Sequence, residues 1–115
     1  MWNFGIPYKL KHYIDLLVQP GLTFSYTPED GYKGLVTGKP VAAVYARGGA
    51  YGPGTGAESY DQQSSYLKQV LGFIGFTGFT GVREIFVEPT LAGADSKDAA
   101  VTKAGKAAEE IAASF

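Results

Sequence analysis

Apolar side chains recur at helical spacing in three stretches of the chain, which predicts three amphipathic helices. The first covers residues 7–19 and is stopped by a Pro-Gly pair. The second begins near Asp61, and Asp61 or Ser59 can cap its first turn. The third is rich in alanine, begins near Asp95 or Ser96, and aligns one apolar stripe: Val101, Ala104, Ala108, Ile111 and Phe115.

Two further stretches are predicted to be strands. Residues 40–46 (PVAAVYA) form a nearly continuous apolar run, typical of a parallel strand covered on both faces. Residues 82–89 (VREIFVEP) form a second strand that Pro89 ends. The segments 21–39 and 50–61 are predicted as long loops, which in compact domains usually carry function or face a partner.

The order helix, strand, helix, strand, helix predicts right-handed βαβ units in an α/β fold. Two parallel strands are too few for an independently stable sheet, which needs three or more. We therefore expect the chain to be the second half of a doubly wound domain with a parallel sheet.

Composition narrows the class of protein. The 115 residues suit one domain, and 45% hydrophobic residues are normal for a globular chain. A net charge of −1 offers no basic surface for nucleic acid or anionic lipid, and the absence of cysteine excludes disulfides and thiolate metal sites. With no apolar run of membrane-spanning length and no signal peptide, we expect a soluble, cytoplasmic protein.

Few side chains suggest catalysis or metal binding. His12 is the only histidine and lies within the first predicted helix, where a surface position is expected. Glu84 and Glu88 share one face of the second strand, and Glu88, at the carboxyl end of that strand, is expected to be a solvated edge residue or to anchor a loop. The glycines of GGAYGPGTGA match neither G-x-G-x-x-G nor a P-loop, so a nucleotide-phosphate loop is not favoured there. These residues support neither a metal site nor Ser/His/Asp catalysis.

Two turns at the carboxyl ends of strands carry the most informative residues: Met1-Trp2-Asn3-Phe4 and Ala46-Arg47-Gly48-Gly49. In an open parallel sheet both would lie along one crevice. Gly48 and Gly49 let backbone N–H groups approach a ligand, and the Asn3 amide offers a donor and an acceptor. Trp2 and Phe4 add flat faces. The set suits a planar heterocycle such as a flavin; the alternative is glycines that only make turns and aromatics that only make core.

Four segments, in order and spacing, resemble one family: MWNFGIPYKLKHYIDLL, GLTFSYT, ARGG after an apolar strand, and YLKQVLGFIGFTG. They are similar to the FMN-dependent NADH:quinone oxidoreductases, also called azoreductases, of the flavodoxin-like superfamily. The resemblance covers nearly the whole chain and implies that residues 1–115 form the carboxyl-terminal half of a single flavodoxin-like domain. It also implies that the first three strands, and the serine-bearing loop that holds the FMN phosphate, lie upstream of Met1.

The resemblance implies contacts with the flavin ring from eight residues: Met1, Trp2, Asn3, Phe4, Ala46, Arg47, Gly48 and Gly49. Ala46 stands where the family has serine, so a backbone contact can persist there but a hydroxyl contact cannot. The resemblance further implies a homodimer in which aromatics of the long loop, Phe24 and Tyr26, wall the partner's flavin. Tyr51 and Phe73 match positions on the substrate side.

The family's reaction is a two-step, ping-pong exchange in which NADH reduces FMN and a quinone or azo compound then takes two electrons. The cofactor carries this chemistry, so no catalytic side chain is implied. Without the phosphate loop we expect this chain alone to bind FMN weakly and to turn over slowly or not at all. Two alternatives stay open: a non-catalytic remnant that pairs with another chain through its sheet edge, and an electron-carrier flavodoxin. The sequence determines neither the preferred acceptor nor the choice between NADH and NADPH.

Overall fold

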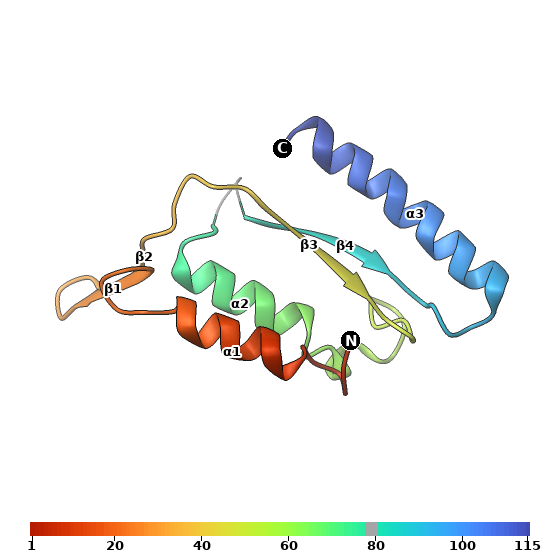
Figure 1. Cartoon of the computed structure of the whole chain (residues 1–115), viewed down its shortest axis with the longest axis horizontal. Coiled ribbons are helices and arrows are strands. Elements are labelled where there is room, and N and C mark those ends of the chain that lie inside the picture. The colour runs from red at the N-terminus through yellow and green to blue at the C-terminus, as the bar shows by residue number, and fades with distance from the viewer. Residues whose placement is uncertain (78–80) are drawn as a thin grey trace.

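The structure is a computed structural model that describes residues 1–77 and 81–115. Its helices are α1 (Tyr8–Leu17), α2 (Ser64–Ile74) and α3 (Ala94–Ala113), with a 3₁₀ turn, η1, at Glu58–Tyr60. Its strands are β1 (Phe24–Thr27), β2 (Gly31–Gly34), β3 (Val41–Ala46) and β4 (Val82–Val87). The predicted order of helix and strand is confirmed for α1, β3, α2, β4 and α3 (Figure 1).

In the described part of the chain, β3 and β4 form a parallel sheet with helices on both sides. Val41 pairs with Val82 at one end of the register and Ala46 with Val87 at the other. Figure 1 shows α1 and α2 on one side of the sheet and α3 on the other. This is the layered α/β arrangement that the alternation of helix and strand predicts.

The prediction that β3 is covered on both faces is wrong. Tyr45 is 2% exposed, but Val44 on the opposite face is 66% exposed. Ala42 and Ala46 share that exposed face. The ring of Tyr45 stacks on Phe86, on the face of the sheet where Glu84 pairs with Lys68 of α2. The helix α3 packs on β4 and lies on the other side of the sheet (Figure 1). The apolar sequence of β3 is therefore covered on one face.

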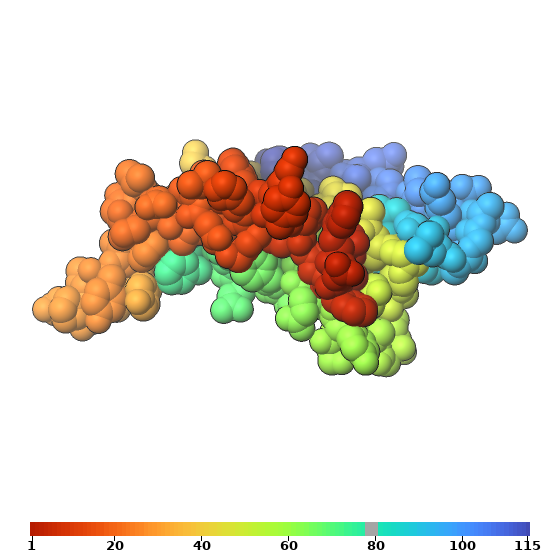
Figure 2. All heavy atoms as spheres, turned by 60° about the horizontal axis from the view of Figure 1, so that its bottom comes forward, coloured from red at the N-terminus to blue at the C-terminus, as the bar shows by residue number. Residues whose placement is uncertain are grey.

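The segment predicted as a loop, residues 21–39, contains an antiparallel hairpin of β1 and β2, which projects from one end of the molecule (Figure 2). The paired positions are Phe24 with Gly34, Ser25 with Lys33, Tyr26 with Tyr32 and Thr27 with Gly31. In the turn, Thr27 Oγ1 accepts the N–H of Asp30 at 3.0 Å, and Gly31 has a φ of +69° that suits glycine. Strands of four residues are too short to show a period, which is why the pattern missed them.

The predicted stripe of α3 is confirmed only in part, because its member Ala104 is buried but its larger members are not. Ala100 and Ala104 are buried, whereas Val101 and Phe115 are 52% and 59% exposed. Small side chains let the helix approach β4 closely, so alanine rather than the larger residues marks the contact. No helix in residues 1–77 or 81–115 is both long and apolar enough to cross a lipid bilayer.

The start of α2 agrees with the sequence, but the start of α3 does not. Asp61 Oδ1 accepts the N–H groups of Gln63 at 3.1 Å and Ser64 at 2.9 Å, which confirms the predicted cap. In contrast, α3 begins at Ala94, ahead of the predicted caps, and no side chain caps it. Asp95 lies in its first turn, where the helix dipole favours a negative charge.

Ile85→Ala is expected to lower the free energy of unfolding by about 2–5 kcal/mol, because it leaves a cavity where α3 packs on β4. Ile85 is 5% exposed. The matched control is Val101→Ala, at an exposed position of α3, which should change stability by less than about 0.5 kcal/mol. Urea unfolding followed by far-UV circular dichroism measures both variants, and equal stabilities would contradict the packing described.

Candidate functional site

The first turn, residues 2–5, has a strained backbone. Trp2 and Gly5 exchange two backbone hydrogen bonds, at 3.0 and 2.9 Å. Between them, Asn3 and Phe4 have φ of +45° and +67°, and a type I′ turn requires positive values at both central residues. Asparagine tolerates this conformation, but a bulky phenylalanine rarely adopts it. Strain of this kind persists where the surrounding structure holds it, and it clusters at functional sites.

This turn is held against the segment that follows β3. The Met1 amine donates to the Ala46 carbonyl at 2.7 Å, and the Gln62 N–H donates to the Phe4 carbonyl at 3.0 Å. The Phe4 ring packs on the ring of Tyr60, with 5.3 Å between centroids. The two predicted turns therefore lie side by side at the carboxyl end of β3 (Figure 2), where ligands gather in open α/β sheets.

Several hydrogen-bond donors on the two turns are open. Within residues 1–77 and 81–115, the N–H groups of Gly48 and Gly49 and the side-chain amide of Asn3 make no hydrogen bond. The neighbouring Arg47 N–H, by contrast, is used, because it donates to the Val87 carbonyl at 3.0 Å. The two turns, which the bond from Met1 to Ala46 joins, therefore carry donors that remain available to acceptors of a ligand.

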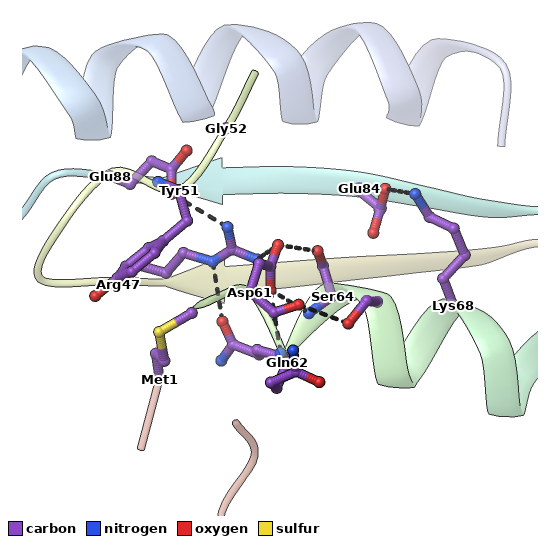
Figure 3. A network of polar contacts seen from close by, with 12 residues as sticks. Met1, Arg47, Tyr51, Gly52, Asp61, Gln62, Ser64, Lys68, Glu84 and Glu88 are labelled. Carbon is purple, nitrogen blue, oxygen red and sulfur yellow. Dashed lines mark hydrogen bonds and ion pairs between the residues drawn. The ribbon is translucent and has the colours of Figure 1, made fainter. Parts of the chain in front are cut away.

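Arg47 extends its side chain into the protein and is 1% exposed. Its Nη2 donates to Asp61 Oδ2 at 2.8 Å, and its Nη1 to Glu88 Oε2 at 3.2 Å (Figure 3). Its Nε donates to Gln63 Oε1 at 3.0 Å. The guanidinium also lies 4.5 Å from the centre of the Phe86 ring, within cation–π range. Arg47 thus joins the ends of β3 and β4 to the segment that starts α2.

The acceptors of Arg47 hold the backbone around them. Glu88 Oε2 also accepts the N–H of Tyr51 at 3.3 Å, which confirms that Glu88 anchors a loop. Asp61 caps α2 through its other oxygen, and Ser64 Oγ donates to Asp61 Oδ2. The open N–H groups of residues 48–49 therefore lie on a loop fixed to two strands and a helix, which favours a preorganised site.

Opposing effects act on the Asp61 carboxyl. Burial alone would raise its pKa, but hydrogen bonds from Ser64 and the charge of Arg47 outweigh burial and hold the pKa below its ordinary value of 3.8. Burial, and then the charge of Glu84, raises the pKa of Tyr45, so this phenol stays neutral.

Glu84, which shares a face of β4 with Glu88, lies largely out of solvent. Its Oε2 forms an ion pair with Lys68 of α2 at 2.7 Å (Figure 3), and its side chain is 14% exposed.

His12 is exposed on α1, as predicted. In GGAYGPGTGA, the N–H of Gly54 donates to the Glu58 carboxylate at 2.7 Å. Among the residues that the structure describes, no group of three His, Cys, Asp or Glu could hold a metal ion.

The predicted substrate-side residues divide into two groups. Phe24, Tyr26 and Phe73 come together with Tyr32, and we call these four the aromatic cluster. Ring centroids lie 4.9 Å apart for Phe24 and Phe73, 4.9 Å for Tyr26 and Tyr32, and 5.6 Å for Tyr32 and Phe73. Tyr51 instead lies beside the first turn. Sequence reasoning missed Tyr32, although a hairpin register pairing it with Tyr26 would have found it.

The comparisons with known proteins agree on one family. A family described as having a flavodoxin-like fold matches residues 1–112. An FMN-dependent NADH:quinone oxidoreductase of Nitratidesulfovibrio vulgaris is 56% identical over 110 residues, which are 96% of this chain and 50% of that protein. An FMN-dependent NADH:quinone oxidoreductase 1 of Bradyrhizobium diazoefficiens is 42% identical over 115 residues, 100% of this chain and 54% of that protein.

Solved structures give the same result. An azoreductase from Bacillus anthracis has a TM-score of 0.83 at 33% identity, over 99% of this chain and 52% of that one. An FMN-dependent NADH-azoreductase from Bacillus anthracis, in complex with FMN, has a TM-score of 0.78 at 26% identity, over 96% of this chain and 52% of that one. The chain spans about half the length of the relatives it matches.

Arg47→Met is expected to lower the free energy of unfolding by about 3–5 kcal/mol, because Asp61 and Glu88 would keep largely buried carboxylates without their cation. Arg47→Lys keeps the charge but not the fork of donors, so it should restore only part of the loss. The control is Lys11→Met, which removes an exposed ion pair with Asp15 and should change stability by less than about 0.5 kcal/mol. Urea unfolding at pH 7 measures all three, and an Arg47→Met value close to the control would contradict the role of Arg47.

Asp61 should also make the stability depend on pH. Because its pKa is lower in the folded chain than in the unfolded chain, its contribution is complete above about pH 5 and is lost as the pH falls through the folded pKa. Asp61→Asn is therefore expected to flatten the fall in unfolding free energy between about pH 5 and pH 3. Urea unfolding across this range tests the expectation, and parallel curves for the two proteins would refute it.

Proposed function

Because the chain belongs to the flavodoxin-like family, we propose that it forms the flavin-ring side of an FMN-dependent oxidoreductase that passes two electrons from NADH to quinones or azo compounds. The observation that carries this proposal is the set of open donors of Asn3, Gly48 and Gly49 on two adjacent turns. The names of the similar proteins, NADH:quinone oxidoreductase and azoreductase, supply the cofactor and the acceptor classes.

The residues present fit the ring of FMN. The N–H donors of Gly48 and Gly49 and the Asn3 amide, which both donates and accepts, suit the alternating acceptors and donors of an isoalloxazine. Trp2 and Phe4 are 68% and 45% exposed and offer flat faces. When bound, FMN supplies the hydride and electron transfer, and these residues would bind and orient it. We therefore assign no catalytic residue in this chain.

The remaining residues predicted to contact the flavin ring, Met1, Ala46 and Arg47, support the ring site in different ways. Ala46 offers its carbonyl to Met1, so these two residues join the turns to each other. The backbone N–H and the side chain of Arg47 are engaged within the protein, so Arg47 supports the ring site by holding the Gly48 turn in place.

We propose that the acceptor binds at two groups of aromatic rings, Tyr51 near the first turn and the aromatic cluster at the far end of α2. Tyr26 and Tyr32 are 59% and 67% exposed on a hairpin that projects from the molecule (Figure 2). The two turns lie at the start of α2, so the cluster would wall the site of a second copy, which supports a homodimer. We propose that the electron donor and the electron acceptor bind in turn, so that NADH leaves before the acceptor enters. The proposed location of the protein is the cytoplasm.

The alternative of a non-catalytic chain that pairs through its sheet edge has one observation in its favour. The outer edge of β3 carries no strand within the residues that the structure describes. NADH-driven quinone reduction after addition of FMN separates the two functions, since the alternative predicts none while still allowing association. Reduction of the bound FMN directly by NADH, without a separate reductase, would also exclude an electron-carrier flavodoxin.

Asn3→Asp is expected to weaken FMN binding about tenfold, because it replaces the donating NH₂ by a negatively charged oxygen of the same shape. Aspartate tolerates the positive φ of position 3, so the turn should persist. His12→Ala, on the exposed face of α1, is the control. Quenching of FMN fluorescence measures the dissociation constant.

The FMN titration is carried out on two forms of the protein. One is the 115-residue chain, and the other is the same chain fused behind the first half of the Nitratidesulfovibrio vulgaris relative. The fusion is expected to bind FMN and to reduce a quinone with NADH. A fusion that folds but binds no FMN, or an Asn3→Asp variant that binds as tightly as wild type, would refute the proposed ring site.

A further inference from the structure

The end of the hairpin crosses the end of α2 backbone against backbone. The Val36 N–H donates to the Ile74 carbonyl at 2.8 Å. A Cβ at Gly34 would lie 2.4 Å from Gly75 N and 2.5 Å from Ile74 C, and a Cβ at Gly75 would lie 2.6 Å from Val36 O. No side chain fits at such distances, so both positions at this crossing require glycine.

At Gly34 the requirement is for space alone. Gly75 has a φ of +128°, which itself favours glycine, but Gly34 has no positive φ. An alanine at position 34 could adopt the local backbone and is opposed only by the chain that passes over it. Gly72, one turn earlier in α2, has nothing within 4 Å of its would-be Cβ. The close approach is thus specific to the crossing.

The crossing lies next to the aromatic cluster. Phe73 directly precedes Ile74, and its ring packs against Phe24 and Tyr32 of the hairpin. Leu35 N–H donates to the Thr23 carbonyl at 2.9 Å, which closes the base of the hairpin beside the crossing. A displacement of the backbone at Gly34 therefore moves the rings of the hairpin relative to Phe73.

We propose that the Gly34–Gly75 crossing fixes the position of the aromatic cluster and thereby determines how well the protein binds flat aromatic acceptors. The inference rests on the proposed function, since it takes the cluster as the acceptor wall. Gly34 and Gly75 are positioning residues that touch no ligand. The rings they place have centroids 4.9 to 6.1 Å apart and are tilted by 49° to 55°, within the range in which aromatic pairs attract, so a quinone ring can pack against the same cluster.

The test compares Gly34→Ala and Gly75→Ala, which add a methyl group from either side of the crossing, with the matched control Gly72→Ala. A fourth variant, Phe73→Leu, removes a ring of the cluster and leaves the crossing intact. Two measurements need no turnover: quenching of tyrosine fluorescence by 1,4-naphthoquinone, and hydrogen exchange of the Val36 amide. In the FMN-loaded fusion protein, KM for the quinone and KM for NADH are measured separately.

Gly34→Ala and Gly75→Ala are expected to weaken naphthoquinone binding by at least about tenfold and to speed Val36 exchange, because the rings move by a fraction of their contact distance. Phe73→Leu should weaken binding without changing Val36 exchange, and Gly72→Ala should change neither. In the fusion, KM for the quinone should rise while KM for NADH stays unchanged.

Unchanged naphthoquinone binding in the crossing variants would overturn the proposal, even with faster Val36 exchange. Loss of all circular dichroism in both variants would also overturn it, because the crossing would then be a requirement for folding. If the wild-type chain binds naphthoquinone through the cluster but the fusion reduces none with NADH, the proposed function fails while the positioning role stands.

Discussion

The arrangement of the candidate site depends on one buried guanidinium. Arg47 donates to side chains from two other parts of the chain, the segment that starts α2 and the end of β4, and its ring contact with Phe86 covers its face. Because the donors of arginine form a planar fork, these partners cannot shift independently. The charge is compensated by Asp61 and Glu88, which makes its burial tolerable and its removal costly. Arg47 therefore fixes the position of the turn that contains Gly48 and Gly49.

Much of the fold was accessible from periodicity, because long amphipathic helices and continuous apolar strands repeat over enough residues to be recognised. The hairpin was not, since β1 and β2 have four residues each. The buried stripe of α3 was predicted only in part because the pattern gives weight to large apolar residues, whereas the buried residues are Ala104, which the predicted stripe included, and Ala100, which it did not. The single covered face of β3 was misjudged because an apolar strand looks the same whether or not both faces have neighbours in the chain.

The candidate site was predicted in part for a similar reason. The two turns could be placed together because carboxyl ends of parallel strands share one edge of the sheet. The partners of Arg47 could not, because Gln63 and Glu88 lie 16 and 41 positions away and no local pattern links them to it. Positive φ at Phe4 was equally hidden, since phenylalanine gives no sign of a left-handed backbone. Close approaches between distant segments, such as Gly34 with Gly75, emerge only when the chain is folded.

The uncovered face of β3 favours self-association of the protein in solution. It combines exposed valine and alanine with an unpaired strand edge in the described part of the chain, a combination that recruits other strands. A net charge of −1 provides almost no repulsion between copies. Near the isoelectric point of about 5.7 even this repulsion disappears. Purification at mildly alkaline pH and low protein concentration therefore suits this chain, and crystallisation near pH 6 would compete with precipitation.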